Sequence, residues 1–523
     1  MASNESRDIQ RAELHKAIWG IADEVRGAVD GWDFKAYILC FLFYRFISED
    51  LAEYIDEGER EASGDASFSY AKLSDEDAEM ARGDVTKEKG FFILPSQLFQ
   101  NVAEAPERDP ELNIHVKQIF EAIEGSSIGT ASEDDFKGLF DDVDVTSNKL
   151  GADLPERNAR LAKIIEGTRD LNFGSVRDAQ IDLFGDAYEY LMNMYASNAG
   201  KSGGEFFTPQ EVSELLAKIV VGNKTSVNKV YDPACGSGSL LLKFAKLLGA
   251  ENVRKGFYGQ EKNPTTYNLC RINMFLHDVN FDRFDIARGD TLLNPKHWDD
   301  EPFDAIVSNP PYSTKWVGDE DPTLINDPRF SPAGVLAPKS RADLAFTMHM
   351  LSWLSSDGTA AIVEFPGVLY RTGAEEQIRR YLVDSNVVSA VIQLPANLFF
   401  GVTIATCIIV LSKSKTDDKT LFVDASELFG HEGNKNKLLP EHIDKIACTV
   451  IDRTEEEHFS RLVSAADLGG ENRYNLSVST WVEKKDTREE IDIVALNARI
   501  KEIVARENEL RCAIDAIVAD LEG

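Results

Sequence analysis

The chain has 523 residues and a formal net charge of −33, and 43% of its residues are hydrophobic. That length is too great for one ordinary core and predicts two or three domains, while the apolar share excludes wholesale disorder. The charge excludes a free-standing nucleic-acid binder with a basic surface. Such a chain either avoids nucleic acid or reaches it with a more basic partner.

The cysteines and histidines indicate no metal site. None of the six cysteines forms a Cys-x-x-Cys pair or lies beside a histidine at metal-ligand spacing. We expect reduced, buried thiols in a cytosolic protein, and no metal. The N-terminus has no signal-peptide core, and the apolar run at residues 36–47 contains Arg45 and is too short to span a bilayer. We therefore expect a soluble, cytoplasmic protein with no membrane contact.

The first third of the chain carries helical periodicity. Apolar residues recur at helical spacing in residues 18–25, and further helices are predicted over residues 32–54 and 141–169. Residues 61–90 are charged and poor in large apolar side chains, which predicts a loop or a weakly ordered excursion. We expect an all-α N-terminal domain.

From Phe173 onward, short apolar runs alternate with helical stretches, which is the pattern of a parallel α/β sheet. Predicted helices fit between several of these runs, at residues 210–220, 240–248 and 342–354. The predicted strands are residues 229–231, 257–259, 284–288, 305–308, 359–364, 387–393, 404–411 and 421–423.

Two segments differ from this alternation. Residues 313–340 hold four prolines and little periodicity, and a loop of that length inside a compact domain is usually functional or mobile. Residues 491–521 place apolar side chains at alternating spacings of three and four, interrupted at Glu507, which predicts a coiled-coil-like helix. The alternative is a helix packed on its own domain. The narrow, charge-flanked seam favours a partner.

A glycine-rich turn, Asp-Pro-Ala-Cys-Gly-Ser-Gly-Ser, joins the first strand of the predicted sheet to a helix. Small residues at such a turn let the backbone approach a nucleotide-like ligand closely. Leu241 replaces the third glycine of a dinucleotide fingerprint, and the lysine of a phosphate loop is missing. Alone, the turn is a weak signal. Its candidate cofactor contacts are Asp232, Gly236, Ser237, Gly238 and Ser239.

Two acidic residues follow the next two predicted strands. Glu261 ends the second strand, where a carboxylate can accept hydrogen bonds from both hydroxyls of a ribose. With the glycine turn before it, ribose binding is favoured over a solvated strand end. Asp290 follows the third strand and can accept from the exocyclic amine of a cofactor adenine. A cap for the next helix is an equally good interpretation of Asp290.

The strongest motif is Asn309-Pro310-Pro311-Tyr312, directly after a predicted strand. The prolines fix the backbone, so that the Asn309 side-chain oxygen and the Pro310 carbonyl can both accept from one planar NH2 group. Two such acceptors draw an aromatic amine toward a tetrahedral shape and stabilise the positive charge that develops when it attacks a sulfonium methyl group. Tyr312 can stack on the base, which must be flipped out of a duplex to reach the pocket. An ordinary proline turn is the alternative, and the upstream glycine turn and Glu261 disfavour it.

Together these motifs resemble those of amino-methylating DNA methyltransferases. The segment Gly-Glu-Phe-Phe-Thr-Pro at residues 204–209 is similar to an element of type I restriction–modification subunits that lines the methionine end of S-adenosyl-L-methionine. The resemblance therefore implies that cofactor and implies adenine-N6 methylation of DNA. It assigns to the cofactor pocket the residues Glu205, Phe206, Phe207, Thr208 and Pro209.

The resemblance extends over nearly the whole chain. Residues 326–330, 341–346 and 394–401 look like segments that follow the family's catalytic motif, and Phe399 or Phe400 would stack on the extruded adenine, with core packing as the equal alternative. The family implies a Rossmann-like class I methyltransferase sheet of seven mostly parallel strands, with one antiparallel strand near its C-terminal edge. The expected domains are residues 1–168, 169–470 and 471–523.

The resemblance also implies partners, which would account for the acidic charge. Double-stranded DNA would be reached through a specificity subunit, typically with a second copy of this chain, and a restriction–translocase subunit can join. We expect the C-terminal helix to dock on the specificity subunit.

Three alternatives stay open at the level of sequence. The same amine-binding geometry serves methyltransferases that act on a protein glutamine or an RNA guanine. A solitary methyltransferase without a nuclease would look the same. A non-catalytic scaffold is disfavoured by the intact Asn309, Tyr312 and Glu261.

Overall fold

The computed structural model describes residues 12–21, 31–173, 187, 190–191, 208–399, 402–433, 435–485 and 493–522. The chain divides into two compact units, Met1–Val482 and Glu483–Gly523. Each unit is described by itself. The domain boundaries drawn from the sequence at residues 168 and 470 stay predictions.

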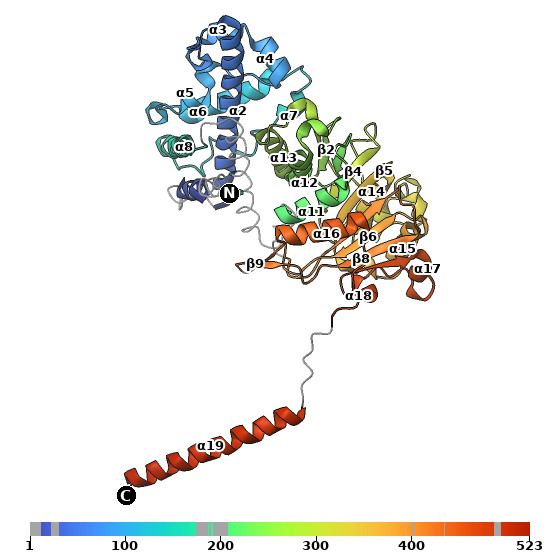
Figure 1. Cartoon of the computed structure of the whole chain (residues 1–523). Coiled ribbons are helices and arrows are strands. Elements are labelled where there is room, and N and C mark those ends of the chain that lie inside the picture. Colours follow the sequence, from blue (N-terminus) through green and yellow to red (C-terminus); the bar gives the residue numbers. More distant parts are fainter. Residues whose placement is uncertain are drawn as a thin grey trace. The chain divides into compact units, whose positions relative to one another are not determined.

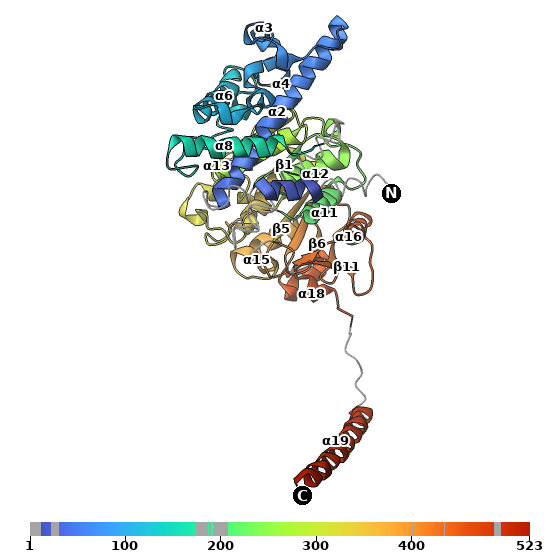
Figure 2. The same cartoon turned by 90° about the vertical axis from the view of Figure 1, so that its left-hand side faces the viewer.

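The described N-terminal residues form helices around an aromatic core. Residues 12–21 are helical, and the apolar run at residues 36–47 lies buried within α2, as a core helix should. Helix α8 packs against α2, as Figure 2 shows. Arg45 of α2 donates a hydrogen bond of 2.7 Å to the carbonyl of Thr168, near the end of α8. The helices are α2 (Gly31–Ser63), α3 (Asp75–Glu79), α4 (Arg82–Lys89), α5 (Phe99–Val102), α6 (Leu112–Ser126), α7 (Glu133–Phe136) and α8 (Leu154–Arg169).

Two expectations for this region need correction. Residues 61–90 are not a loop, because they continue α2 and form α3 and α4 around a few buried side chains. Tyr70 is one of these, and its hydroxyl donates 2.8 Å to the Ile93 carbonyl. The third predicted helix begins at Leu154 rather than at residue 141, because Asp153 caps it by accepting from the Glu156 amide.

The sheet has nine strands rather than seven, in the order β11-β8-β6-β7-β5-β4-β1-β2-β3. The seven from β6 to β3 make the expected sheet, in which only β7 is antiparallel to its neighbours. Parallel β8 and antiparallel β11 extend it beyond β6. The strands are β1 (Val230–Asp232), β2 (Phe257–Glu261), β3 (Phe284–Arg288), β4 (Phe303–Ser308), β5 (Leu354–Glu364), β6 (Val388–Gln393), β7 (Cys407–Ser412), β8 (Lys419–Asp424) and β11 (Ser460–Ser464). A separate two-stranded ribbon joins β9 (Gly430–Glu432) to β10 (Lys435–Lys437).

Helices cover both faces of this sheet, which is why its strands read as continuous apolar runs. Along β4 and β5, alternate side chains enter two separate cores: Val307 and Val363 face one, and Ile306 and Ile362 face the other. The first core is continuous with that of the N-terminal helices. The main covering helices (Figure 1) are α11 (Gln210–Val221), α12 (Ser239–Leu248), α13 (Pro264–Leu276), α14 (Asp343–Trp353), α15 (Ala374–Asp384) and α16 (Pro440–Asp452).

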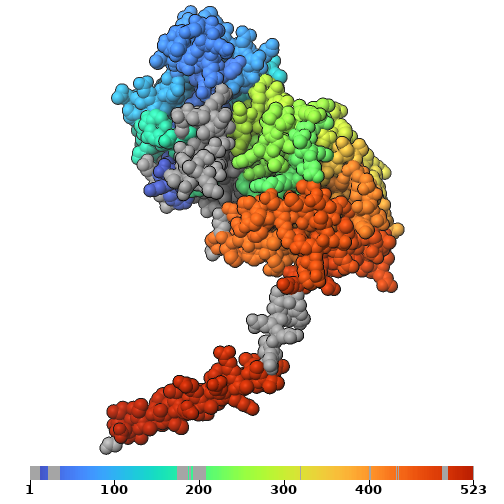
Figure 3. All heavy atoms as spheres, in the orientation of Figure 1, coloured from blue at the N-terminus to red at the C-terminus, as the bar shows by residue number. Residues whose placement is uncertain are grey.

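Contacts between distant segments hold this unit together. Lys218 of α11 forms an ion pair of 2.8 Å with Asp444 of α16, and the orange surface around α16 meets the green surface of residues 208–260 in Figure 3. Arg271 of α13 donates to the carbonyls of Asp134 and Lys137, at 2.8 and 3.0 Å. The N-terminal helices are therefore bonded directly to the helix that follows β2.

Residues 313–340 pack into the second core of the sheet. They contain three short 3-10 turns, and Leu324, Phe330 and Leu336 are buried. The absence of periodicity in the sequence therefore reflects a folded segment made of turns.

The C-terminal unit contains one long helix, α19 (Ile493–Glu522). The apolar residues of the predicted seam are exposed along it, from 48% at Leu496 to 81% at Leu521. Both the docking of this helix on a partner and its packing on its own domain stay predictions. Among the described helices, none combines the length and apolar character that crossing a membrane requires.

Candidate functional site

The glycine turn lies between β1 and α12, at the carboxyl edge of the sheet. Gly238 has a φ of 80°, and a Cβ there would lie 2.8 Å from the Cys270 sulfur. Both the backbone conformation and the contact require glycine. The buried Asn273 of α13 donates 2.9 Å to the Ser237 carbonyl. The turn is thus held from the side of α13.

Asp232 ends β1 and is fully buried. One of its oxygens accepts from the Ala234 amide and the Ser308 hydroxyl, both at 2.9 Å, and the other oxygen has no hydrogen-bond partner among the described residues. Burial, together with the charge of Glu261, raises the pKa of Asp232 to about 7. The bond from Ser308 links the end of β1 to the end of β4.

Glu261 faces the glycine turn from the end of β2. Its two oxygens accept from the backbone amides of Gly236 and Asn263, at 3.1 and 2.7 Å. Burial raises the pKa of its carboxyl group. Glu261 therefore lies beside the glycine turn, and its contact with a ribose stays a prediction.

Asp290 follows β3 in a turn. It accepts from the Leu292 and Leu293 amides, at 3.1 and 3.3 Å, and forms an ion pair of 2.8 Å with Lys262. No helix follows directly, so the carboxylate caps a turn rather than a helix. Its contact with a cofactor adenine stays a prediction.

The Asn309 amide is fixed at the end of β4, beside β1. Its nitrogen donates 3.0 Å to the Thr208 hydroxyl, and its oxygen accepts from the Tyr312 hydroxyl at 2.5 Å. These two bonds hold the amide in place, with its oxygen toward Tyr312. Pro310 is buried and Pro311 is partly exposed. Thr208 belongs to the predicted cofactor element, so the structure brings that element and the catalytic motif together.

The ring of Tyr312 lies among other aromatic rings. It stacks on Phe365 at 4.3 Å and meets Phe399 edge-on at 6.3 Å. The residue keeps some exposed surface, but its hydroxyl end is enclosed, and this burial raises the pKa of Tyr312 well above its usual range. The hydroxyl therefore stays protonated and can donate.

Sequence reasoning missed Phe365 and the buried carboxyl group of the preceding residue, Glu364. Glu364, the last residue of β5, is fully buried and accepts 3.0 Å from the Thr347 hydroxyl. Burial, with a smaller contribution from Asp343, raises the pKa of Glu364 well above its usual range. Position was the available signal, because Glu364 ends β5, which pairs with β4, and Phe365 directly follows it.

Several predicted site residues have defined places and others do not. Thr208 is buried, Pro209 precedes α11, and Ser237 and Ser239 are buried in the glycine turn. The remaining predicted positions lie outside the described residues: Glu205, Phe206, Phe207 and Phe400.

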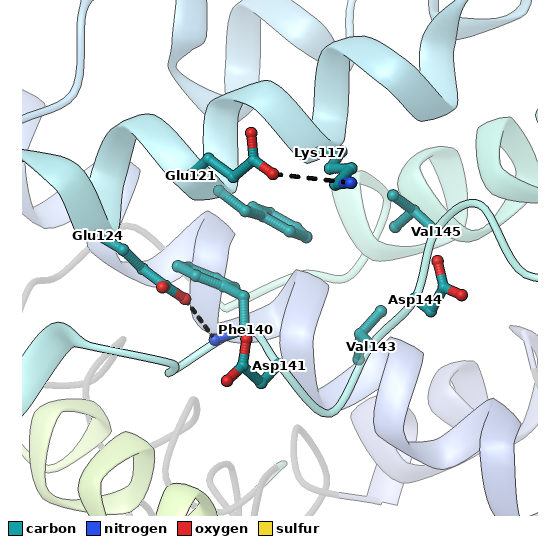
Figure 4. Close-up of a pocket in the computed structure, with 9 residues that line it drawn as sticks. Lys117, Glu121, Glu124, Phe140, Asp141, Val143, Asp144 and Val145 are labelled. Carbon is teal, nitrogen blue, oxygen red and sulfur yellow. Dashed lines mark hydrogen bonds and ion pairs between the residues drawn. The ribbon is translucent and has the colours of Figure 1, made fainter.

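A separate hollow of about 210 Å³ lies in the N-terminal helical region (Figure 4). Phe120 and Phe140 form part of its wall, stacked at 4.2 Å, and Glu124 accepts 2.9 Å from the Phe140 amide. Lys117 and Glu121 form an ion pair at its rim. None of the sequence-predicted site residues lines this hollow.

Comparison with known proteins gives two family matches that together span most of the chain. The family described as N-6 DNA methylase matches residues 179–490. The family described as the HsdM N-terminal domain matches residues 14–167.

Curated relatives and solved structures agree with these matches. The methylase subunit of the type I restriction enzyme MpnII from Mycoplasma pneumoniae is 47% identical, over 99% of this chain and 97% of its own. The methylase subunit of MjaVII from Methanocaldococcus jannaschii is 29% identical, over 96% of this chain and 82% of its own. A crystal structure of a type I restriction-modification methyltransferase subunit from Streptococcus thermophilus has a TM-score of 0.81 at 32% identity, covering 90% of this chain and all of that one.

Proposed function

We propose that the end of β4 is the catalytic centre of this chain, which belongs to the methylase subunits of type I restriction enzymes within the N-6 DNA methylase family. One observation carries the proposal. The Asn309 amide is held by Thr208 and Tyr312 at the end of β4, with its oxygen toward Tyr312. An acceptor in this position is what a planar target amine requires.

The glycine turn and Glu261 fit S-adenosyl-L-methionine, the methyl donor that membership of this family implies. Gly238 allows the turn to pack closely against Cys270 of α13, and Glu261 supplies carboxylate oxygens beside the turn. Thr208 and Pro209 would contact the methionine end, together with Glu205, Phe206 and Phe207. Asp232, Gly236, Ser237, Ser239 and Asp290 complete the proposed pocket. When bound, the cofactor supplies a sulfonium methyl group.

Asn309 and its neighbours prepare the amine for this transfer. The Asn309 oxygen and the Pro310 carbonyl accept from the N6 amine of a flipped-out adenine, and they stabilise the positive charge that develops on its nitrogen. The oxygen of Asn309 accepts from the Tyr312 hydroxyl, and the target amine would share this oxygen with the hydroxyl or replace it. Tyr312, Phe399 and Phe400 would enclose the base.

Partners account for how so acidic a chain reaches DNA. We propose that it binds double-stranded DNA together with a specificity subunit and a second copy of itself, and that a restriction–translocase subunit can join. The exposed seam of α19 is the proposed docking surface for the specificity subunit. The complex would act in the cytoplasm, on chromosomal DNA.

Two variants separate cofactor binding from methyl transfer. In the assembled complex with its DNA target, Asn309→Ala should lower turnover by about a thousandfold while leaving the cofactor Kd within about twofold. Glu261→Ala should raise that Kd by about tenfold or more, because it removes charge-assisted hydrogen bonds to the ribose. Radiolabelled methyl transfer and titration calorimetry measure the two effects. Full turnover in Asn309→Ala would contradict the proposed centre.

A further inference from the structure

We propose that Arg329 is a positioning residue for the cofactor pocket, because it ties residues 313–340 to the chain segments that follow β1 and β3. The inference rests on the proposed function, since Asp232 ends β1 and Asp290 lies in the segment that follows β3. None of the interactions of Arg329 involves the proposed cofactor contacts directly. Its effect would pass through the backbone that places them.

Arg329 is almost completely buried, at 2% exposure, and its partners lie on several segments. It forms an ion pair of 2.8 Å with Asp327 in its own turn. Its Nη1 and Nη2 atoms donate to the carbonyls of Thr291 and Leu292, at 2.9 and 2.8 Å. These two carbonyls directly follow Asp290. The guanidinium therefore holds the backbone of the proposed adenine-binding turn.

Thr291 carries the connection on to the glycine turn. Its hydroxyl donates 2.6 Å to the carbonyl of Pro233, which follows Asp232. Thr291 is itself buried, so water cannot easily replace this bond. Arg329 and Thr291 thus link three strand-end segments of one edge of the sheet: those after β1, β3 and β4.

A second connection reaches β1 through His349. Arg329 lies 3.3 Å from the Nδ1 atom of His349, and the Nε2 atom lies 3.0 Å from the Tyr231 hydroxyl. Arginine only donates, so Nδ1 accepts and the ring proton is on Nε2, facing Tyr231. Burial lowers the pKa of His349 well below its usual range, and the neighbouring arginine adds to this, which keeps the ring neutral. Tyr231 precedes Asp232, so Arg329 is connected to both sides of that residue.

Lysine cannot reproduce this arrangement. The planar guanidinium presents five donors in a fixed geometry, and here they reach a carboxylate, two carbonyls and an imidazole. Its face also lies 4.7 Å from the ring centroid of Phe330 and 5.5 Å from that of Trp298. An ammonium group has three donors around one point and would leave some of these buried acceptors unpaired.

The test compares Arg329→Lys with Arg379→Lys. Arg379 is equally buried and donates to the carbonyls of Tyr474 and Val368, at 2.9 and 2.8 Å, which lie outside the strand-end segments linked by Arg329. Both variants should unfold at a lower temperature, because each loses buried hydrogen bonds. Only Arg329→Lys should weaken cofactor binding, by about tenfold, with kcat at saturating cofactor within about threefold of the parent.

Titration calorimetry with S-adenosyl-L-methionine on the full chain gives the Kd, and methylation of target DNA by the assembled complex gives kcat. An unchanged Kd in Arg329→Lys would overturn the proposal, and so would an equal rise in both variants. Loss of turnover in Asn309→Ala tests the proposed catalytic centre separately, because the calorimetry needs no methyl transfer.

Thr291 provides a second comparison if Arg329→Lys does not fold. Thr291→Val removes the hydroxyl bond to Pro233 and preserves the shape of the side chain, whereas Thr291→Ser keeps the hydroxyl. We expect Thr291→Val to raise the cofactor Kd by about threefold or more, and Thr291→Ser to restore it to within about twofold of the parent. Equal affinities for the two Thr291 variants would overturn the connection through Pro233.

Discussion

Asn309 illustrates how neighbouring residues give one side chain a defined chemical role. An isolated asparagine can present either end of its amide, but here Thr208 accepts from the nitrogen and Tyr312 donates to the oxygen. The motif in the sequence predicted the acceptor. It did not predict that Thr208 orients it, because 100 residues of chain separate the two and only the folded sheet edge brings them together.

Tyr312 combines a ring and a hydroxyl whose contributions can be separated. Tyr312→Phe keeps the ring that stacks on Phe365 and removes only the hydrogen bond to Asn309, so we expect kcat to change by no more than about fivefold. Tyr312→Ala also removes the stacking surface, and we expect kcat/KM for DNA to fall by about tenfold or more beyond Tyr312→Phe. Steady-state methylation assays measure both, and equal losses in the two variants would argue against a role for the ring.

Asp232 should make stability depend on pH. Its pKa is about 7 in the folded chain and about 4 when unfolded, so the folded state holds an extra proton between these values and loses stability as pH rises through them. From pH 6 to pH 8 the loss is about 1.4 kcal/mol.

The variant Asp232→Asn lacks this titration. Without cofactor, the parent should therefore lose more of its thermal midpoint between pH 6 and pH 8 than Asp232→Asn does. Differential scanning calorimetry measures both midpoints, and parallel pH dependences would show that Asp232 does not titrate in this range.

At the scale of elements, the apolar strands were predictable and the edge strand β11 was not. Successive side chains of β4 and β5 enter two buried cores in alternation, so each strand is a nearly continuous run of apolar residues. Such a run identifies a buried strand from the sequence alone. β11 pairs on one side only and has an exposed Arg461 and a partly exposed Leu462, which leaves too weak a pattern to distinguish it from a loop. Apolar residues have no regular spacing in the turns of residues 313–340, so the sequence did not predict that Arg329 is buried there.

The glycine turn offers a prediction about backbone geometry. Gly238→Ala places a Cβ at a φ of 80° and 2.8 Å from the Cys270 sulfur, whereas at Gly222, with a φ of 56°, the nearest atom would be 4.0 Å away. Gly238→Ala costs about 1–2 kcal/mol of backbone strain, because Gly238 lies in the left-handed region, and Gly222→Ala is also strained because its φ is positive. Only Gly238→Ala should also displace the turn and raise the cofactor Kd by about tenfold. Calorimetry with Gly222→Ala as the control checks this, and equal cofactor affinities would mean that the close contact is unimportant.

At the scale of the whole molecule, net charge and the C-terminal helix both indicate a protein that works in a complex. A charge of −33 opposes DNA binding, and α19 carries an exposed apolar seam that a partner would bury. Membership of the methylase subunits of type I restriction enzymes is consistent with both features. Neither feature identifies the target DNA sequence. We propose that a different chain, the specificity subunit, recognises that sequence.

Removing the C-terminal helix tests whether α19 binds the specificity subunit while the other unit binds the cofactor. A chain that lacks residues 491–523 should no longer co-purify with the specificity subunit but should bind the cofactor with an unchanged Kd, because the cofactor residues all lie in the other unit. Replacing seam residues Ile503 and Ile514 by serine in the full-length chain provides a milder version. Normal assembly of either form would contradict the proposed docking surface.

The most direct test of the account is base-resolved sequencing of N6-methyladenine in cells that carry this chain and its specificity subunit. The parent, Asn309→Ala and the surface control Asn472→Ala would be compared. We predict methylation of one defined DNA motif in the parent and in Asn472→Ala, and its disappearance in Asn309→Ala. Methylation that persists in Asn309→Ala, or that is missing from the parent, would contradict an adenine-N6 transfer centred on this residue.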